Sequence, residues 1–215
     1  MKTAIIFSGG LDSSVLSYLM AKEGDIALIT FDYGQRHIKE AECAKIIANR
    51  LGAEHHLVDI SSVKRLLKGS SLTDSNVDVP MSAYDKETMS LTVVPNRNAI
   101  MLSIAWGFAK SHGFNKVACG VHSGDHFIYP DCRPDFINSM RESLRLATES
   151  PEMNLLTPFV NLSKGEIVMI GHGLGVPFDQ TWSCYKGEEH HCGKCGTCLG
   201  RKEAFREAGL EDPTI

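Results

Sequence analysis

A short turn near the N-terminus carries residues that could bind phosphate. It reads Ser8-Gly9-Gly10-Leu11-Asp12-Ser13-Ser14, follows the apolar run Ala4-Ile5-Ile6-Phe7 and precedes a helical pattern. Two glycines permit a tight turn, and the next helix would present free N–H groups and its positive dipole end to an anion. Neither GxxxxGKS/T nor GxGxxG is present. We interpret the turn as a phosphate cradle of another kind; the alternative is an ordinary strand–turn–helix joint with a Ser or Asp cap.

Four cysteines near the C-terminus have metal-ligand spacing. Cys184, Cys192, Cys195 and Cys198 form the pattern C-x7-C-x2-C-x2-C, with glycines between the last three. Four thiolates this close suit a tetrahedral zinc ion, and four protein ligands leave no open position, so we expect a structural site. Disulfides and an iron–sulfur cluster are the alternatives. The neighbouring His190 and His191 could also be ligands, although exposed loop histidines are the simpler interpretation.

The elements that must position these residues alternate between strand and helix. This order predicts an α/β fold with a parallel, doubly wound sheet of Rossmann type, whose ligands bind at the carboxyl ends of the strands. The polar segment 69–92 interrupts the rhythm, and its length is typical of a lid or a binding loop. The predicted strands cover residues 2–7, 26–31, 54–58 and 116–120, and the predicted helices cover 12–22, 38–51, 96–112, 134–148 and 163–172, the last with a capping box at Ser163 and Glu166.

Composition is that of a compact enzyme. The 215 residues, 43% of them hydrophobic, suffice for one substantial core with a small appendage. We therefore expect one α/β domain over 1–180, which contains the turn at 8–14, and a small zinc-binding segment over 181–215 packed on it. The net charge of −4 argues against a large nucleic-acid footprint. With no signal peptide and no apolar run of roughly 18 residues, we expect a cytoplasmic protein that does not contact a membrane.

The turn at 8–14 resembles the Ser-Gly-Gly-x-Asp-Ser loop of the ATP-pyrophosphatase (PP-loop) superfamily, which has an adenine nucleotide alpha hydrolase-like fold. Five segments in order along the chain resemble one member, the QueC family of queuosine-precursor biosynthesis. In place of the glycine expected in Val-Pro-Gly-Arg-Asn the chain has Asn96, which tolerates the left-handed conformation. The matching segments begin at Phe7-Ser8-Gly9-Gly10, Asp32-Tyr33-Gly34-Gln35-Arg36-His37, Val94-Pro95-Asn96-Arg97-Asn98, Tyr129-Pro130-Asp131-Cys132-Arg133 and Thr181-Trp182-Ser183-Cys184-Tyr185.

The resemblance implies a definite reaction. The substrates would be 7-carboxy-7-deazaguanine, ammonia and ATP, and the product would be the nitrile 7-cyano-7-deazaguanine. ATP would activate the carboxylate for attack by ammonia, and a second activation would allow the amide to lose its oxygen. Whether AMP and pyrophosphate or ADP and phosphate are released stays open. Members of this kind often form homodimers, which makes a homodimer possible here.

The resemblance also suggests residue roles. Ser8, Gly9, Gly10, Leu11, Asp12, Ser13 and Ser14 would bind ATP, and Asp12 would also help to hold Mg²⁺. Arg97 and Lys164 could stabilise negative charge in the reaction, or could be solvated surface cations. Asp125, Tyr129, Asp131 and Arg133, which follow the strand at 116–120, could bind the deazaguanine ring. Asp131 could equally cap the helix that follows it. Cys132 lies nearby and could be a reactive thiol.

Two other functions remain open. One is a tRNA-modifying member of the same superfamily, for which a basic face or an added RNA-binding domain would be expected. The other is a zinc-stabilised nucleotide-binding module without catalytic activity, which the intact loop and Asp12 disfavour.

Overall fold

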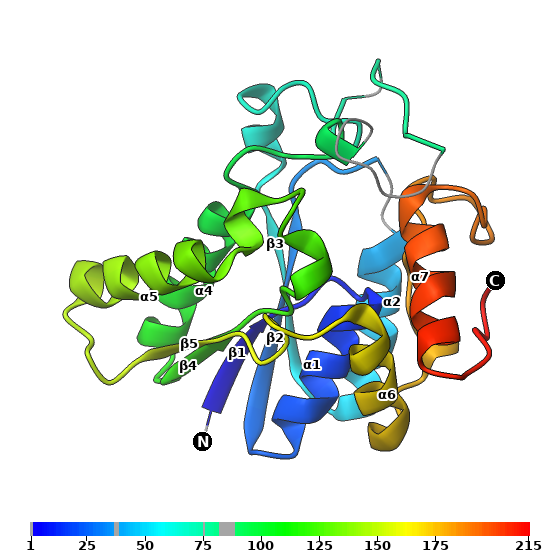
Figure 1. The fold of residues 1–215 in the computed structure, drawn as a ribbon. Helices are drawn as coiled ribbons and strands as arrows, with labels where there is room; N and C mark the ends of the chain where they lie inside the picture. The colour runs from blue at the N-terminus through cyan, green and yellow to red at the C-terminus, as the bar shows by residue number, and fades with distance from the viewer. Residues whose placement is uncertain (1, 37–38, 75, 82–88) are drawn as a thin grey trace.

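The fold is built on one five-stranded sheet. The computed structural model describes residues 2–36, 39–74, 76–81 and 89–215 (Figure 1). All paired strands are parallel, and their order across the sheet is β3-β2-β1-β4-β5. The strands are β1 (Lys2–Ile6), β2 (Asp25–Asp32), β3 (Glu54–Asp59), β4 (Lys116–Ala118) and β5 (Asn154–Leu156).

This strand order contains a point where the chain reverses its direction of travel across the sheet. From β1 the chain moves outward through β2 to β3, then returns to place β4 on the other side of β1. The loops after β1 and β4 therefore leave the sheet in opposite directions and open a crevice at the carboxyl ends of these strands, where ligands bind in such sheets. The predicted parallel sheet is confirmed. The turn at residues 8–14, called the phosphate-type loop below, lies at this crevice.

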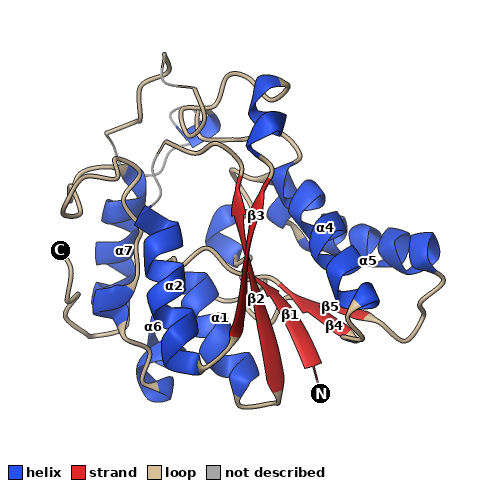
Figure 2. Cartoon of the chain, turned by 180° about the vertical axis from the view of Figure 1, so that it is seen from behind, coloured by secondary structure: helices blue, strands red, loops and turns tan. Residues whose placement is uncertain are grey.

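Helices cover both faces of the sheet, as Figure 2 shows. Strand residues are apolar on both sides, and successive side chains point to opposite faces. Ala4 and Ala27 accordingly join the core under α4, whereas Ile5 and Leu28 join the core under α1. One layer contains α1 (Leu11–Ala21), α2 (Lys39–Leu51), α6 (Lys164–Leu174) and α7 (Gly196–Glu207); the other contains α4 (Arg97–Ser111) and α5 (Pro134–Thr148).

Local sequence signals explain where two of these helices begin. Ser163 caps α6: its Oγ accepts from the N–H of Glu166, whose carboxylate accepts from the N–H of Ser163, so the predicted capping box is confirmed. Asn96 precedes α4 with φ 60°, the left-handed conformation expected for the residue that replaces glycine.

Some elements differ from the prediction. β5 and α7 were not expected, because a three-residue strand has no readable periodicity and α7 begins inside the cysteine pattern. Ile38, part of the predicted helix 38–51, and His37 lie outside the described residues, as do residues 75 and 82–88 of the expected lid segment. The described start of that segment is packed rather than free, since Ser70 and Ser71 are fully buried. Within the described ranges, no helix is both long and apolar enough to cross a membrane.

Candidate active site and metal centre

A cavity of about 270 Å³ lies at the crevice between β1 and β4. Its walls include the ends of three neighbouring strands, at Phe7, Phe31 and Cys119. The predicted site residues Asp12, Arg97 and Lys164 also line it, although they come from three different helices. The tertiary fold thus brings the phosphate-type loop and two cations to one place.

The two glycines of the loop have different roles. Gly9 has φ +81°, and a Cβ there would lie 2.3 Å from the carbonyl oxygen of Glu40, so α2 packs directly against the loop backbone. Gly10 has an ordinary extended conformation and lines the cavity, and its N–H donates to the Ser8 hydroxyl at 3.1 Å. The loop therefore needs Gly9 for its close contact with α2, whereas Gly10 forms part of the cavity wall.

The loop residues divide into those that face the cavity and those behind it. Ser8, Gly10, Leu11, Asp12 and Ser13 line the cavity. Gly9 and Ser14 do not: the Ser14 side chain is fully buried, and its hydroxyl donates to the Gly10 carbonyl at 2.7 Å. The hydroxyls of Ser8 and Ser13 lie 3.1 Å apart and stabilise the turn from within.

Asp12 is the centre of a charged cluster on the cavity wall. Its Oδ2 lies 3.1 Å from Nζ of Lys164 and 4.0 Å from Nε2 of His122. Burial by itself would raise the pKa of Asp12, but Lys164 and His122 outweigh it, so the pKa lies below its ordinary value. The other oxygen, Oδ1, is buried and has no hydrogen-bond partner. A hard divalent cation is a suitable partner for such an oxygen.

Arg97 is the first residue of α4 and points its charge into the same cavity. Its guanidinium lies 5.8 Å from the centroid of the Tyr33 ring. Burial disfavours its charge, but nearby Tyr33 and Asp131 favour it, and the pKa of Arg97 stays above its ordinary value. Arg97 is therefore a fixed cation rather than a solvated surface residue.

The four residues predicted to bind the deazaguanine ring separate into two pairs. Asp125 and Tyr129 line the cavity, and the Tyr129 hydroxyl lies 2.7 Å from that of Thr92. Asp131 and Arg133 do not line it. Asp131 accepts from the N–H of Asn98 at 3.0 Å and so caps α4, not the helix that follows it in sequence. Arg133 is exposed and donates to the carbonyl of His126.

Glu40, His122 and Trp182 are among the cavity residues that were not predicted as site residues. His122 lies between the carboxylates of Asp12 and Asp125. Glu40 stands in the first turn of α2, and burial raises its pKa to about 7 even though Arg97 and Lys164 lower it. No local pattern marked Glu40 or His122, because only the fold brings them to the loop. Trp182 lies in one of the five family-like segments, but no site role was predicted for it. Cys132, in contrast, is buried, and burial raises the pKa of its thiol, which disfavours the reactive thiolate.

The four predicted cysteines form a cluster suited to a metal ion. Their sulfur atoms all lie within 4.8 Å of one another, with 3.5 Å between Cys195 and Cys198 and 3.9 Å between Cys192 and Cys198. Zinc–sulfur bonds of about 2.3 Å in a tetrahedron require sulfur atoms about 3.8 Å apart, which these distances approach. All seven cysteines are free in this structure, and the sulfur–sulfur distances of 3.5 and 3.9 Å exceed the disulfide bond length of about 2.05 Å.

The backbone around the cluster favours deprotonated sulfur. The N–H groups of Lys186 and Cys192 point at the sulfur of Cys184 from 3.4 Å, and those of Lys194 and Cys195 point at Cys192. Such donors stabilise thiolates, the form that binds metal.

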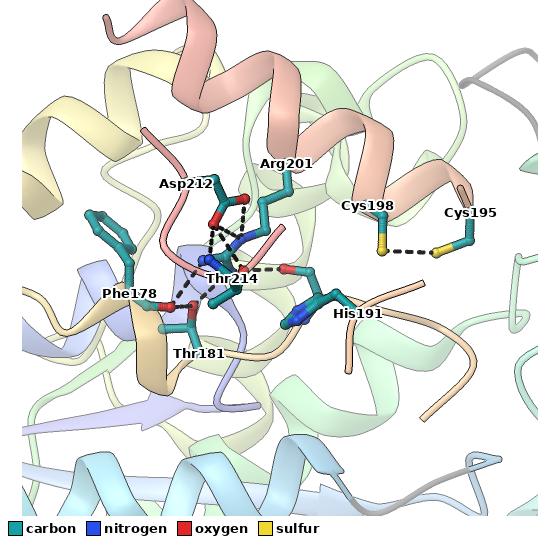
Figure 3. A network of polar contacts seen from close by, with 9 residues as sticks. Phe178, Thr181, His191, Cys195, Cys198, Arg201, Asp212 and Thr214 are labelled. Atoms are coloured by element: carbon teal, nitrogen blue, oxygen red, sulfur yellow. Dashed lines mark hydrogen bonds and ion pairs between the residues drawn. The ribbon is translucent and has the colours of Figure 1, made fainter. Parts of the chain in front are cut away.

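A buried arginine holds the C-terminal segment together (Figure 3). Arg201 of α7 is fully buried, and its Nε pairs with the Asp212 carboxylate at 2.9 Å. Its other nitrogens donate to the Thr181 hydroxyl at 2.7 Å and the Phe178 carbonyl at 3.0 Å. The network fastens residues 178–183 and the C-terminal tail to the helix that carries Cys198.

His191 corrects one expectation about the cysteine loop. Its ring packs on Trp182, with centroids 4.3 Å apart, and its Nε2 accepts from the N–H of Ser183. Burial lowers the pKa of His191 to about 4, so the ring is neutral at physiological pH. It is therefore a packed structural residue, while His190 is exposed as expected.

Comparison with known proteins identifies relatives over the whole chain. The family described as "Queuosine biosynthesis protein QueC" matches residues 2–209. A relative from Brucella anthropi named 7-cyano-7-deazaguanine synthase is 54% identical over all of this chain and 93% of its own length. Another of that name, from Rhizobium johnstonii, is 53% identical over all of this chain and 91% of its own.

Solved structures show the same fold at low sequence identity. The NMN synthetase of Francisella tularensis aligns with a TM-score of 0.54 and 14% identity, covering 97% of this chain and 77% of that one. The NH3-dependent NAD synthetase of Campylobacter jejuni aligns with a TM-score of 0.51 and 14% identity, covering 83% and 66%. These likenesses confirm the predicted α/β architecture.

Proposed function

Because this chain belongs to the QueC family of queuosine biosynthesis enzymes, we propose that it converts 7-carboxy-7-deazaguanine, ammonia and ATP to 7-cyano-7-deazaguanine. The observation that carries this proposal is the convergence of the loop at 8–13, Asp12, Lys164 and Arg97 on one cavity. A carboxylate is a poor electrophile, so the site must bind a triphosphate and the carboxylate together and stabilise charge as oxygen is phosphorylated.

The cations of the cavity have distinct tasks in this reaction. Lys164 is held at 3.1 Å from Asp12, and its charge faces the loop where phosphates would bind. Arg97 lies on the opposite helical layer and would neutralise the substrate carboxylate or a leaving phosphate. Both side chains are held before substrate arrives, so little reorganisation is needed during the reaction.

We assign Asp12 as a residue that holds Mg²⁺. Its unpartnered Oδ1 and lowered pKa fit a hard cation that needs an ionised oxygen ligand. The ion would neutralise phosphate charge at this wall of the cavity. His122 and Asp125, next to Asp12, would keep its side chain oriented.

For the deazaguanine ring we propose the wall formed by Asp125 and Tyr129. A carboxylate can accept from the N–H edge of a guanine-like base, and an aromatic side chain offers an apolar surface. Asp131 and Arg133, also predicted from sequence, would act on the pocket indirectly, since Asp131 caps α4 at Asn98 next to Arg97.

We propose Zn²⁺ as the metal of the four-cysteine cluster, with a structural role. Four sulfur ligands close the coordination shell, and the site would fasten residues 181–215 onto the domain formed by 1–180. Metal analysis of purified protein tests the identity: one zinc per chain is expected, and iron with acid-labile sulfide would favour the cluster alternative.

Small molecules, rather than tRNA, are the proposed substrates, and two chains are proposed to associate. The net charge of −4 gives little attraction for a polyanion. β3 is an edge strand with Leu57 61% exposed, a surface that a second copy could cover. Light scattering coupled to gel filtration distinguishes a dimer of about twice 23.6 kDa from a monomer.

One incubation tests the proposed reaction. The protein is mixed with ATP, Mg²⁺, an ammonium salt and 7-carboxy-7-deazaguanine, and both base and nucleotide are followed by mass spectrometry. We expect nitrile to appear, with AMP or ADP identifying which bond of ATP breaks. ATP consumption without nitrile would mean that the loop is active but the assigned substrate is wrong.

A further inference from the structure

Glu40 is an acidic residue in the cavity that the activation chemistry above does not use. It lies in the first turn of α2, whose backbone packs directly on Gly9. Its Oε1 lies 4.0 Å from the position that a Cβ would take at Gly10. The carboxylate therefore sits beside the phosphate-type loop and borders the space where substrates would meet.

Among the described residues, no N–H or O–H group donates to this carboxylate within hydrogen-bond distance, and no cationic nitrogen lies within 4.0 Å of it. The other acids at the site are engaged, since Asp12 pairs with Lys164 and Asp125 lies 3.5 Å from His122. As far as the described part of the chain is concerned, Glu40 thus has an oxygen available to bind a cationic ligand.

Four titratable groups face Glu40 from the elements around it. They are Arg97 of α4, Lys164 of α6, Tyr33 after β2, and Cys43 one turn further along α2. The two cations lower the pKa of Glu40, but burial outweighs them and raises it to about 7. A carboxyl group with this pKa can both accept and release a proton near neutral pH.

The reaction needs such a group, because ammonia at neutral pH is almost entirely ammonium, which has no free electron pair. Resting on the proposed function, we propose that Glu40 binds ammonium and is its proton acceptor. One N–H bond of ammonium breaks, and the proton moves to a Glu40 carboxylate oxygen. The nitrogen electron pair then forms a bond to the activated carboxyl carbon. The bond from that carbon to the phosphorylated oxygen breaks, and this oxygen leaves with its electron pair. The nitrogen, which still carries three hydrogens and a positive charge, loses a second proton to solvent, and the neutral amide results.

The test compares two nucleophiles in wild type and Glu40→Gln. Hydroxylamine is largely neutral at pH 7 and attacks activated carboxylates without prior loss of a proton, giving a hydroxamate. We expect Glu40→Gln to lower amide and nitrile formation from ammonium at pH 7 by about 10²–10⁴-fold. Hydroxamate formation should stay near that of wild type. The ammonium reaction of the variant should recover as pH rises, because free ammonia becomes abundant.

Glu42→Gln is the matched control. Glu42 lies in the same turn of α2 but is exposed and pairs with Lys39, so its variant should behave as wild type with both nucleophiles. ATP affinity, measured by calorimetry without ammonium, should be unchanged in both variants.

Two results would overturn the role of Glu40. Equal loss of amide and hydroxamate in Glu40→Gln would place Glu40 in activation or folding instead. Weakened ATP binding with an unchanged preference between nucleophiles would make it a phosphate or metal contact. Failure of the proposed function is distinguishable from both, because wild type would then form neither nitrile nor hydroxamate from 7-carboxy-7-deazaguanine.

Discussion

The backbone N–H of Trp182 donates a hydrogen bond of 3.1 Å to the carbonyl oxygen of Gly9. This bond joins the segment that leads into the cysteine cluster to the loop at the carboxyl end of β1. The Trp182 indole also donates to the carbonyl of Cys184, a proposed metal ligand, at 2.7 Å. Trp182 therefore connects the phosphate-type loop directly to the proposed metal centre through one hydrogen bond on each side.

We expect loss of the metal to weaken nucleotide binding. Cys198→Ser removes one ligand of four, which should lower the metal content, the melting temperature and the affinity for ATP, because Trp182 loses its anchor. Metal analysis, thermal unfolding and calorimetry measure the three effects. Cys43→Ser is the control, since Cys43 packs against the cluster but is not one of its ligands. Full ATP affinity in metal-free Cys198→Ser would show that the two sites are independent.

Asp212→Ala should destabilise the protein strongly. It leaves the guanidinium of Arg201 buried with its charge uncompensated, and breaking a buried pair in this way costs about 3–5 kcal/mol. Chemical denaturation measures the change in the free energy of unfolding. Glu211→Ala changes an exposed neighbour and should be close to neutral. A small effect at Asp212 would mean that the C-terminal tail is not held by this pair.

Gly9→Ala should abolish activity, while Gly52→Ala should not. Both glycines have positive φ, at +81° and +59°, which costs a residue with a side chain about 1–2 kcal/mol. A Cβ at Gly52 meets nothing within 4 Å, whereas at Gly9 it would meet the Glu40 carbonyl oxygen at 2.3 Å. The difference in melting temperature between the two variants therefore measures the cost of the steric clash with α2, because the cost of the positive φ is common to both. Similar melting temperatures would show that α2 can move away from the loop.

Lys164→Met should lower kcat/KM for ATP by about 10²–10³-fold, because it removes a preorganised cation. It should also raise the pKa of Asp12, since burial then acts against a weaker opposing charge. Activity would consequently fall at a higher pH on acidification than in wild type. Lys110→Met, which breaks an exposed pair with Glu152, is the control. Reduced activity with an unchanged pH profile would show that Lys164 contributes to catalysis without controlling the pKa of Asp12.

Glu40→Gln should make stability less dependent on pH. The pKa of Glu40 is raised from 4.5 to about 7 on folding, so its contribution is fully present below pH 4.5 and is lost as pH rises toward 7. The variant does not ionise there, and we expect it to exceed wild type in stability at pH 8 by about 1–3 kcal/mol, the range allowing for partial exposure to solvent. Unfolding curves at pH 5 and pH 8 measure the difference. If the stability difference between variant and wild type is the same at pH 5 and pH 8, Glu40 has an ordinary pKa.

Local sequence patterns predicted the parts of the site that depend on near neighbours. The loop at 8–14 and the cysteine spacing were readable because strand, turn and helix follow one another directly, and because the four sulfurs come from 15 consecutive residues. The capping box at Ser163 was readable for the same reason. Asp131 was harder to interpret, because a carboxylate can cap any helix start within reach, and the nearest in space is α4.

Taken alone, the sequence determined the α/β architecture, the glycine turn at the end of the first strand, the spacing of the four clustered cysteines and the family. Hydrophobic periodicity and short-range spacing suffice for the first three, since they reflect backbone geometry within one or two elements, whereas the family was predicted from the resemblance of five motif segments. Only the tertiary structure decided that Glu40, His122 and Trp182 face the same cavity as Asp12. These residues reach the loop from separate elements, and pairing of β1 with both β2 and β4 is what brings those elements together. Contacts between distant segments leave no periodic signal in the chain, and the family-like segment that contains Trp182 does not show which residues it faces.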